Sequence, residues 1–187
     1  MDFDIPRDIA AYLLELDEFI VREIKPLEQR NDNIRFFDHR REDARTDWDR
    51  GGLPNEEWEQ LLRQARKLAD KAGHYRYPLP KELGGKDGTN LGMAIIREHL
   101  SAKGLGLHND LQNEHSIVAN NVGVLLMIEY GNDAQKKEFV NGLLEGTTGF
   151  AFGITVVLPR PPKPPLYPVN RFDSTGASCT ALACRRR

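Results

Sequence analysis

The sequence predicts an all-α fold: an orthogonal or up-and-down bundle of five or more helices, ending in the first strand of a β-domain and a disordered tail. Three observations predict it. Apolar residues recur every three or four positions through most of residues 5–145, as they do on the buried face of a helix. Capping residues and glycines interrupt this period where helices would begin and end. After residue 155 the period stops, and a proline-rich stretch begins.

The composition limits the size and class of the protein. Its 187 residues are 40% hydrophobic and 29% charged, which suits one domain with a core and is too little for two large ones. The net charge of −2 offers nothing that would attract nucleic acid. No apolar run approaches the roughly 20 residues that cross a membrane, and the acidic start is unlike a signal peptide. We expect a soluble, cytoplasmic protein, with a mitochondrial or peroxisomal location left open.

The first two helices have the clearest apolar stripes. Pro6 suits a first helical turn, and the stripe that follows it runs through Ile9, Leu13, Leu16, Ile20, Ile24 and Leu27. Residues 31–52 are polar and predict a long connection. A second helix is expected from about Pro54 to Ala72, ended by Gly73.

Three more helices are expected before residue 145. Residues 74–88 are rich in proline and glycine and predict a turn-rich loop, after which Thr89 caps a third helix that Gly104 and Gly106 end. The next helix is expected over 111–130 and is the most apolar. Asn132 to Gln135 predicts a capping box, with a helix to Leu144.

The last segments differ in character from the helices. Residues 150–155 are typical of a strand. Residues 156–187 contain six basic side chains against one acidic, a net charge of +5, together with six of the eleven prolines and both cysteines. We therefore predict three parts: a helical domain over 1–149, the start of a strand over 150–155 and a disordered tail over 156–187.

Three segments together resemble the N-terminal half of the acyl-CoA dehydrogenase family. Pro80-Lys81-Glu82-Leu83-Gly84-Gly85 is similar to its P-x-x-x-G-G loop, and Tyr130-Gly131-Asn132-Asp133-Ala134-Gln135-Lys136-Lys137 to its Y-G-x-x-x-Q-K turn. Phe150 to Thr155 is similar to the strand that continues with T-E-P in the family. Their order, their spacing and the order of helices agree over about residues 5–155.

The resemblance stops after Thr155. The family continues with Glu-Pro, whereas this chain has Val156-Val157 and then the proline- and arginine-rich tail. Such a tail is typical of GC-rich DNA that is translated out of frame. We expect a frameshift, a mispredicted splice or a truncated gene model, and the coding DNA downstream of Thr155 would test this.

The resemblance implies FAD-dependent oxidation of an acyl-CoA thioester to the enoyl-CoA, with FAD as cofactor and acyl-CoA as substrate. In the family, a glutamate base removes the α-proton while the flavin accepts the β-hydrogen as hydride. The resemblance places that base in a C-terminal helical domain absent here, so no catalytic residue is expected in this chain. It also implies a homo-oligomer for the full-length protein. We hold two expectations for this chain. The first is a dehydrogenase fragment that is inactive alone, and the second is a helical interaction or subunit-pairing module without catalysis.

The resemblance also implies site residues. Phe152, Ile154 and Thr155 match the strand positions that approach the flavin, although packing of the strand against helices explains the two apolar side chains at least as well. The expected helix 111–130 corresponds to one that lines the acyl pocket, so Glu114, His115 and Val118 are the candidate substrate residues. The alternative for Glu114 and His115 is a solvated polar turn.

Rival signals are weak. The histidines show no metal-binding spacing, and no metal site is expected; the nearest cluster is His108 with Glu114 and His115. Gly84 to Gly88 lacks the lysine–serine or lysine–threonine ending and the preceding strand of a phosphate loop. The P-x-x-P spacings in the tail lack the flanking basic residues of an SH3 ligand.

Overall fold

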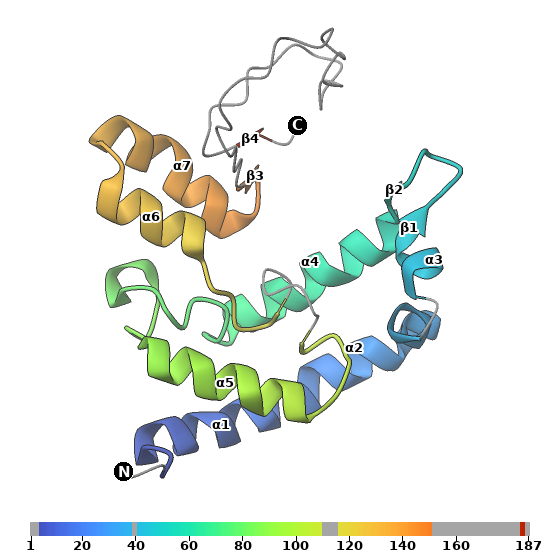
Figure 1. The fold of residues 1–187 in the computed structure, drawn as a ribbon, viewed down its shortest axis with the longest axis horizontal. Helices are drawn as coiled ribbons and strands as arrows, with labels where there is room; N and C mark the ends of the chain where they lie inside the picture. Colours follow the sequence, from blue (N-terminus) through green and yellow to red (C-terminus); the bar gives the residue numbers. More distant parts are fainter. Residues whose placement is uncertain (1–3, 39–40, 110–115, 151–183, 186–187) are drawn as a thin grey trace, which may run out of the picture. The chain divides into compact units, whose positions relative to one another are not determined.

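The computed structural model describes residues 4–38, 41–109, 116–150 and 184–185. The chain divides into two compact units, Met1–Asn121 and Val122–Arg187, and each is described here by itself. Unit 1 and unit 2 denote these ranges below. The described residues are mostly helical, with a few strands of two residues each, as Figure 1 shows. The predicted all-α class is confirmed.

Unit 1 begins with one long helical rod in three parts. These are α1 (Arg7–Phe19), a π-helical turn η1 (Ile20–Ile24) and α2 (Lys25–Gln29). The wide turn ends two residues before Pro26, which has no N–H to donate and whose ring would clash with the carbonyl four residues earlier in an α-helix. In the π turn, the Lys25 N–H instead reaches back five residues to the Ile20 carbonyl. The predicted first helix therefore continues through its proline.

The predicted long connection contains short elements. They are η2 (Arg30–Phe37), α3 (Arg41–Arg45) and an antiparallel pair of two-residue strands, β1 (Thr46–Asp47) and β2 (Leu53–Pro54). Within η2, Asn31 and Asp32 take left-handed backbone angles, which these residue types tolerate best after glycine. The sharp bend lets Phe36 become fully buried, with its ring centroid 5.2 Å from that of Trp58.

The next two helices of unit 1 begin and end where capping residues predict. The helix α4 (Glu56–Lys71) begins at Asn55, whose side chain accepts the Glu57 N–H at 2.9 Å, and is followed by Gly73 at φ +79°. A short turn, η3 (Lys81–Leu83), lies in the loop before α5 (Asn90–Ala102). Thr89 caps α5 by accepting the Gly92 N–H at 3.1 Å. Both predicted helices are confirmed.

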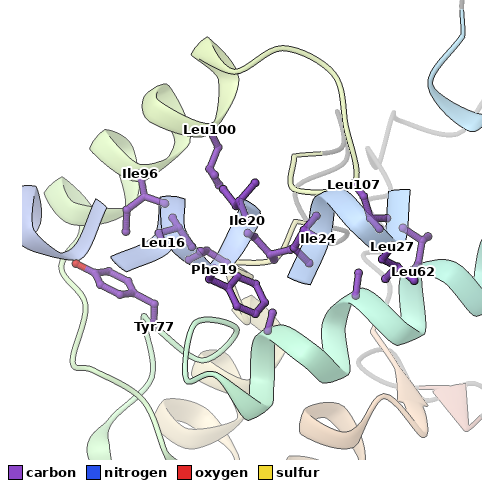
Figure 2. Close-up of a cluster of buried hydrophobic side chains, with 14 of the residues drawn as sticks. Leu16, Phe19, Ile20, Ile24, Leu27, Leu62, Tyr77, Ile96, Leu100 and Leu107 are labelled. Atoms are coloured by element: carbon purple, nitrogen blue, oxygen red, sulfur yellow. The ribbon is translucent and has the colours of Figure 1, made fainter. Parts of the chain in front are cut away.

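One apolar core holds unit 1 together. The rod formed by α1, η1 and α2 lies between α5, which contributes Ile96 and Leu100, and α4, which contributes Leu62, as Figure 2 shows. The core residues on the rod are Ile9, Tyr12, Leu13, Leu16, Phe19, Ile20, Ile24 and Leu27. Burial of apolar area at about 25 cal/mol per Å² makes this stripe the main stabilising feature of unit 1.

Unit 2 contains a helical hairpin, α6 (Val122–Tyr130) and α7 (Asp133–Glu145). The predicted capping box is confirmed. Gln135 N–H donates to the Asn132 side chain at 2.9 Å, and Asn132 N–H donates to the Gln135 side chain at 3.0 Å. The capping box therefore explains the Y-G-x-x-x-Q-K segment as the turn between α6 and α7. Gly146, at φ +71°, ends α7.

The end of the chain differs from the prediction in one respect. A two-residue strand β3 (Thr148–Gly149) precedes the predicted strand 150–155 and pairs antiparallel with β4 (Cys184–Arg185). Cys184 and Arg185 belong to the tail for which no stable structure was predicted, and here they form a two-residue ladder with β3. Residues 151–183 lie outside the described part of the chain, so the boundaries proposed for the strand and tail stay predictions.

Candidate functional site

Of the six predicted site residues, the structure describes one. Glu114 and His115 lie within 110–115, and Phe152, Ile154 and Thr155 lie within 151–183, all outside the described residues. Val118 is described and is fully buried in the core of unit 1. The candidate site is therefore built around residues 116–121, called the 116–121 segment below.

The 116–121 segment is not helical, so the predicted helix over 111–130 was wrong in these residues; its ordered helix begins at Val122. Local side-chain hydrogen bonds explain the difference. The Ser116 hydroxyl accepts the Val118 N–H at 3.3 Å, and Asn121 takes a left-handed backbone at φ +49°. Serine and asparagine side chains that satisfy the nearby backbone compete with a helix, although apolar periodicity alone favours one.

The segment is anchored to the turn after α4. The Tyr75 carbonyl accepts two hydrogen bonds, from the Ala119 N–H at 3.2 Å and from the Asn121 side-chain amide at 3.0 Å. This pairing joins two parts of unit 1 that are more than 40 residues apart in sequence. The conformation of residues 119–121 is therefore fixed by the position of Tyr75.

Arg97 on α5 anchors the same segment from another element. Its Nη2 donates to the Val118 carbonyl at 2.6 Å and to the Asn120 side-chain oxygen at 3.0 Å. Hydrogen bonds from a charged donor are stronger than neutral ones, because the donor carries a full charge. The buried residues Ile117, Val118 and Ala119 are thus held between α5 and the Tyr75 turn.

The loop that resembles P-x-x-x-G-G positions this turn. A Cβ on Gly85 would collide with the backbone of Leu79 and lie 2.8 Å from the Arg76 carbonyl, and one on Gly88 would collide with the Tyr77 ring. The loop therefore closes around Tyr77, two residues after the anchor Tyr75. The Lys86, Asp87 and Gly88 N–H groups donate to the Tyr77 and Leu79 carbonyls. Since these amides are occupied, they do not form a phosphate cradle.

In unit 2, two helical glycines leave space for Thr148 and Phe150, which precede the predicted flavin contacts. A Cβ on Gly123 of α6 would lie 2.9 Å from the Phe150 ring, and one on Gly142 of α7 would collide with the Thr148 side chain. Phe150 therefore packs on α6. The backbone that enters 151–155 starts from a fixed position in unit 2.

Two sets of paired polar side chains lie elsewhere in unit 1, one buried and one at the surface. His74 Nδ1 lies 3.2 Å from the Tyr12 hydroxyl, and both rings are in the core. Burial lowers the pKa of His74 and raises the pKa of Tyr12. At the surface, Asp17 accepts from His99 Nε2 at 2.7 Å and from Lys103 Nζ at 2.8 Å.

Neither pair forms a metal centre. In the described ranges, no three histidine, cysteine, aspartate or glutamate residues lie close enough together to hold a metal ion. Among those same residues, no helix is both long and apolar enough to cross a membrane.

Residues 27–147 match the family model described as Acyl-CoA dehydrogenase, N-terminal domain. The match covers well over half of the chain and includes α4, α5 and α6, the 116–121 segment and the capping box of α7. The match assigns this helical range to a class of dehydrogenase N-terminal domains. The chain belongs to the acyl-CoA dehydrogenase family. No curated protein and no solved structure matches the chain.

Tyr75, Arg97, Asn120 and Asn121 were missed in the sequence. The adjacent asparagines inside an apolar stretch were the one available signal, because buried amides need partners and disfavour a helix interior. Nothing in the sequence pattern pairs them with Arg97 or Tyr75. Val118, a candidate substrate residue, has its side chain in the core of unit 1, and its role toward a substrate stays a prediction.

Proposed function

We propose that the chain supplies the helical N-terminal part of an FAD-dependent acyl-CoA dehydrogenase, which oxidises an acyl-CoA thioester to the enoyl-CoA. The single observation that carries this proposal is the family match over residues 27–147. The anchored 116–121 segment supports it, because a pocket wall must keep its shape when a long, flexible substrate binds.

Within this proposal, Val118 backs the wall of the acyl pocket rather than lining it. Its side chain is buried in the core, and its carbonyl is held by Arg97. Glu114 and His115, directly before this segment, are the residues that we propose to meet the substrate. Arg97 and Tyr75 act as positioning residues, since they hold the segment and not the substrate.

The proposed flavin contacts are Phe152, Ile154 and Thr155. The described part of unit 2 fits this role at one point, where the Gly123 surface accepts Phe150 and so fixes the start of residues 151–155. When bound, FAD would supply the hydride acceptor for the oxidation. The residues of this chain would orient the flavin, and a β-domain would complete its pocket.

The polypeptide of 187 residues is proposed to have negligible activity alone. No segment of it resembles the C-terminal helical domain that carries the base in the family. Loss of a positioned base removes about 10²- to 10⁴-fold in rate, and an open pocket loses substrate orientation as well.

Dye-linked oxidation of short-, medium- and long-chain acyl-CoAs, with FAD added to the purified chain, tests this proposal. We expect no turnover above background and loss of most flavin absorbance on desalting. Turnover well above background would contradict the proposal. Its disappearance in Glu114→Gln or His115→Ala, but not in Glu59→Gln on α4, would then locate a base inside the helical domain.

A second candidate function is subunit pairing without catalysis. One observation favours it: on the apolar helix α6, Val122 is 41% exposed, and Leu125, Leu126 and Ile128 are only half-buried. Half-exposed apolar faces of this kind mark interaction sites. Light scattering together with hydrophobic-dye binding discriminates the two candidates, because a pairing module forms dye-negative oligomers, whereas an unpaired fragment keeps these apolar faces exposed and binds the dye.

A further inference from the structure

A buried carboxylate lies against the turn that follows α5. Glu28 on α2 is 4% exposed. Its Oε1 pairs with Lys25 Nζ at 3.0 Å, and its Oε2 accepts the Leu107 N–H at 2.9 Å. A buried carboxylate is tolerated only when it is paired and hydrogen-bonded, and both conditions are met here. Glu28 therefore fixes the backbone of residues 106–108 from a helix nearly 80 residues away in sequence.

His108 lies beside this carboxylate and is fully buried. A Cβ placed on Gly106 would lie 2.7 Å from His108 Nδ1 and 2.8 Å from Glu28 Oε2, so the imidazole and the carboxylate share the space at Gly106. Within the described chain, neither ring nitrogen of His108 makes a hydrogen bond of ordinary geometry, and the Leu100 carbonyl is the one backbone group that acts on the ring as an acceptor. Buried polar groups without partners are rare in folded proteins and are often functional.

A hydrogen-bonded path leads from this cluster to Val118. The Ser116 hydroxyl donates to the His108 carbonyl at 3.4 Å, and the Val118 N–H donates to the Ser116 hydroxyl at 3.3 Å. Glu28 thus holds Leu107, the next residue His108 holds Ser116, and Ser116 holds Val118. The path connects α2 with the 116–121 segment through buried groups.

We propose that this path is a proton-controlled switch, in which protonation of the buried His108 releases the 106–108 turn and with it the 116–121 segment. In the closed state, which has these hydrogen bonds intact, Glu28 is the positioning residue. In the open state the 106–108 turn and the 116–121 segment are released. That the switch governs a substrate pocket rests on the proposed function, whereas the switch itself does not.

The charged groups around His108 decide the sign of the effect. Burial lowers the pKa of His108, and Lys25 and Lys103 add to this lowering, while Glu28 and the Leu100 carbonyl oppose it. The closed state therefore binds the proton more weakly than the open state, whose histidine has the ordinary pKa of about 6.5. The closed state is fully populated above that pH and is lost as the pH falls below it.

Proton and amide NMR of the full chain at pH 8.0 to 5.0 tests the switch without any ligand. We expect the His108 Cε1 proton to titrate with a midpoint below 6.5. The protection factor of the Val118 amide should fall in the same range, by up to about tenfold per pH unit for a one-proton opening. A Val118 protection factor that is flat between pH 6.5 and the His108 midpoint would overturn the proposal.

Variants separate the switch from general acid sensitivity. In His108→Gln, the Val118 protection factor should lose its dependence on pH, whereas His99→Gln, in a histidine that pairs with Asp17 away from the path, should keep it. If His108→Gln does not fold, Glu28→Gln takes its place. It should lower the protection of both Leu107 and Val118 at every pH, and an unchanged Val118 would contradict the path. Failure of acyl-CoA oxidation leaves these amide measurements unaffected, so the two proposals fail separately.

Discussion

Arg97 joins α5 to the 116–121 segment through two acceptors, the Val118 carbonyl and the Asn120 side chain. We predict that Arg97→Gln lowers the free energy of unfolding by about 2 kcal/mol, because a charged donor is lost and a buried carbonyl keeps fewer partners. Urea unfolding followed by circular dichroism measures this. Arg63→Gln, on the exposed side of α4, is the control and should change the value by less than about 0.5 kcal/mol. Equal effects of both variants would show that Arg97 acts only through its charge.

Gly85 lies where the loop leaves no space for a side chain. We predict that Gly85→Ala destabilises the protein by about 3 kcal/mol, because its Cβ would occupy the position of the Leu79 backbone. Gly104→Ala is the matched control. Gly104 has φ +81° but open space around it, so only backbone strain of about 1 kcal/mol is expected. Thermal unfolding of both variants makes the comparison, and a similar loss in both would mean that the loop around Gly85 can move.

The sequence predicted only some of the residues that form the candidate site. It singled out Val118 by resemblance, but Arg97 and Tyr75 escaped notice because they bind backbone carbonyls and amides from distant segments. Such pairings leave no periodic pattern. A buried Arg–carbonyl contact becomes visible only when α5 and the segment are placed in three dimensions.

Among the elements, α1 and α5 are joined at the surface by Asp17. Burial raises the pKa of Asp17, but hydrogen bonds from Lys103 and His99 outweigh burial, so its pKa lies below the usual value. We predict that Asp17→Asn lowers the free energy of unfolding by about 0.5 to 1 kcal/mol at pH 7, since the pair is partly solvated.

The dependence of this contribution on pH has a definite sign. A carboxylate with a lowered pKa in the folded state stabilises it above the unfolded-state pKa of about 3.9, and the contribution is lost as the pH falls further. The difference between wild type and Asp17→Asn should therefore shrink below pH 4 in urea titrations. Glu18→Gln, next to it on the exposed side, should show no such difference. A gap that persists at pH 2.5 would contradict this account.

The helix α7 depends on its capping box. Asn132→Ala should cost about 1 kcal/mol, because the Gln135 N–H loses its acceptor at the start of the helix. Amide exchange should accelerate in the first turn of α7 and much less at its end. Lys137→Ala, an exposed position in the same helix, provides the comparison and should leave exchange in that first turn unchanged.

The elements that were predicted well are those with local causes. Thr89, Asn132 and Gly73 begin or end helices through contacts within a few residues, so a single sequence suffices to locate them. The helix predicted over 111–130 was wrong for residues 116–121 because the Ser116 side chain binds the local backbone and the residues after it bind Arg97 and Tyr75. Tertiary hydrogen bonds outweighed a strong apolar period there.

For the whole molecule, two buried histidines predict how stability varies with pH. Burial lowers the pKa of both His74 and His108. The unfolded chain therefore binds more protons below pH 6.5, and the free energy of unfolding should fall as the pH drops, by up to about 1.4 kcal/mol per pH unit for each histidine. Urea midpoints between pH 8 and 5 measure this. The double variant His74→Gln/His108→Gln should flatten the curve, and an unchanged slope would assign the effect to other groups.

The apolar core of unit 1 was largely predictable, since the stripes of the first two predicted helices supply most of it. Phe36 was not, because it comes from a polar connection whose bend brings it onto Trp58. The pairing of β3 with β4 was not predicted either. Strand pairing between distant residues depends on chain geometry, and two-residue strands have no sequence pattern of their own.

The π turn at Ile20–Ile24 also decides which direction Glu28 faces. In an uninterrupted α-helix each residue advances by about 100°, which would turn Glu28 about 80° away from Ile20 and toward one flank of the rod. A π turn holds more residues, so each advances less, and every side chain after it is rotated back toward the core. Pro26, by favouring the π turn, therefore sets the rotation of α2 about the helix axis. Replacing Pro26 by alanine, so that the turn relaxes to α geometry, would swing the carboxylate away from Leu107 without altering Glu28 itself.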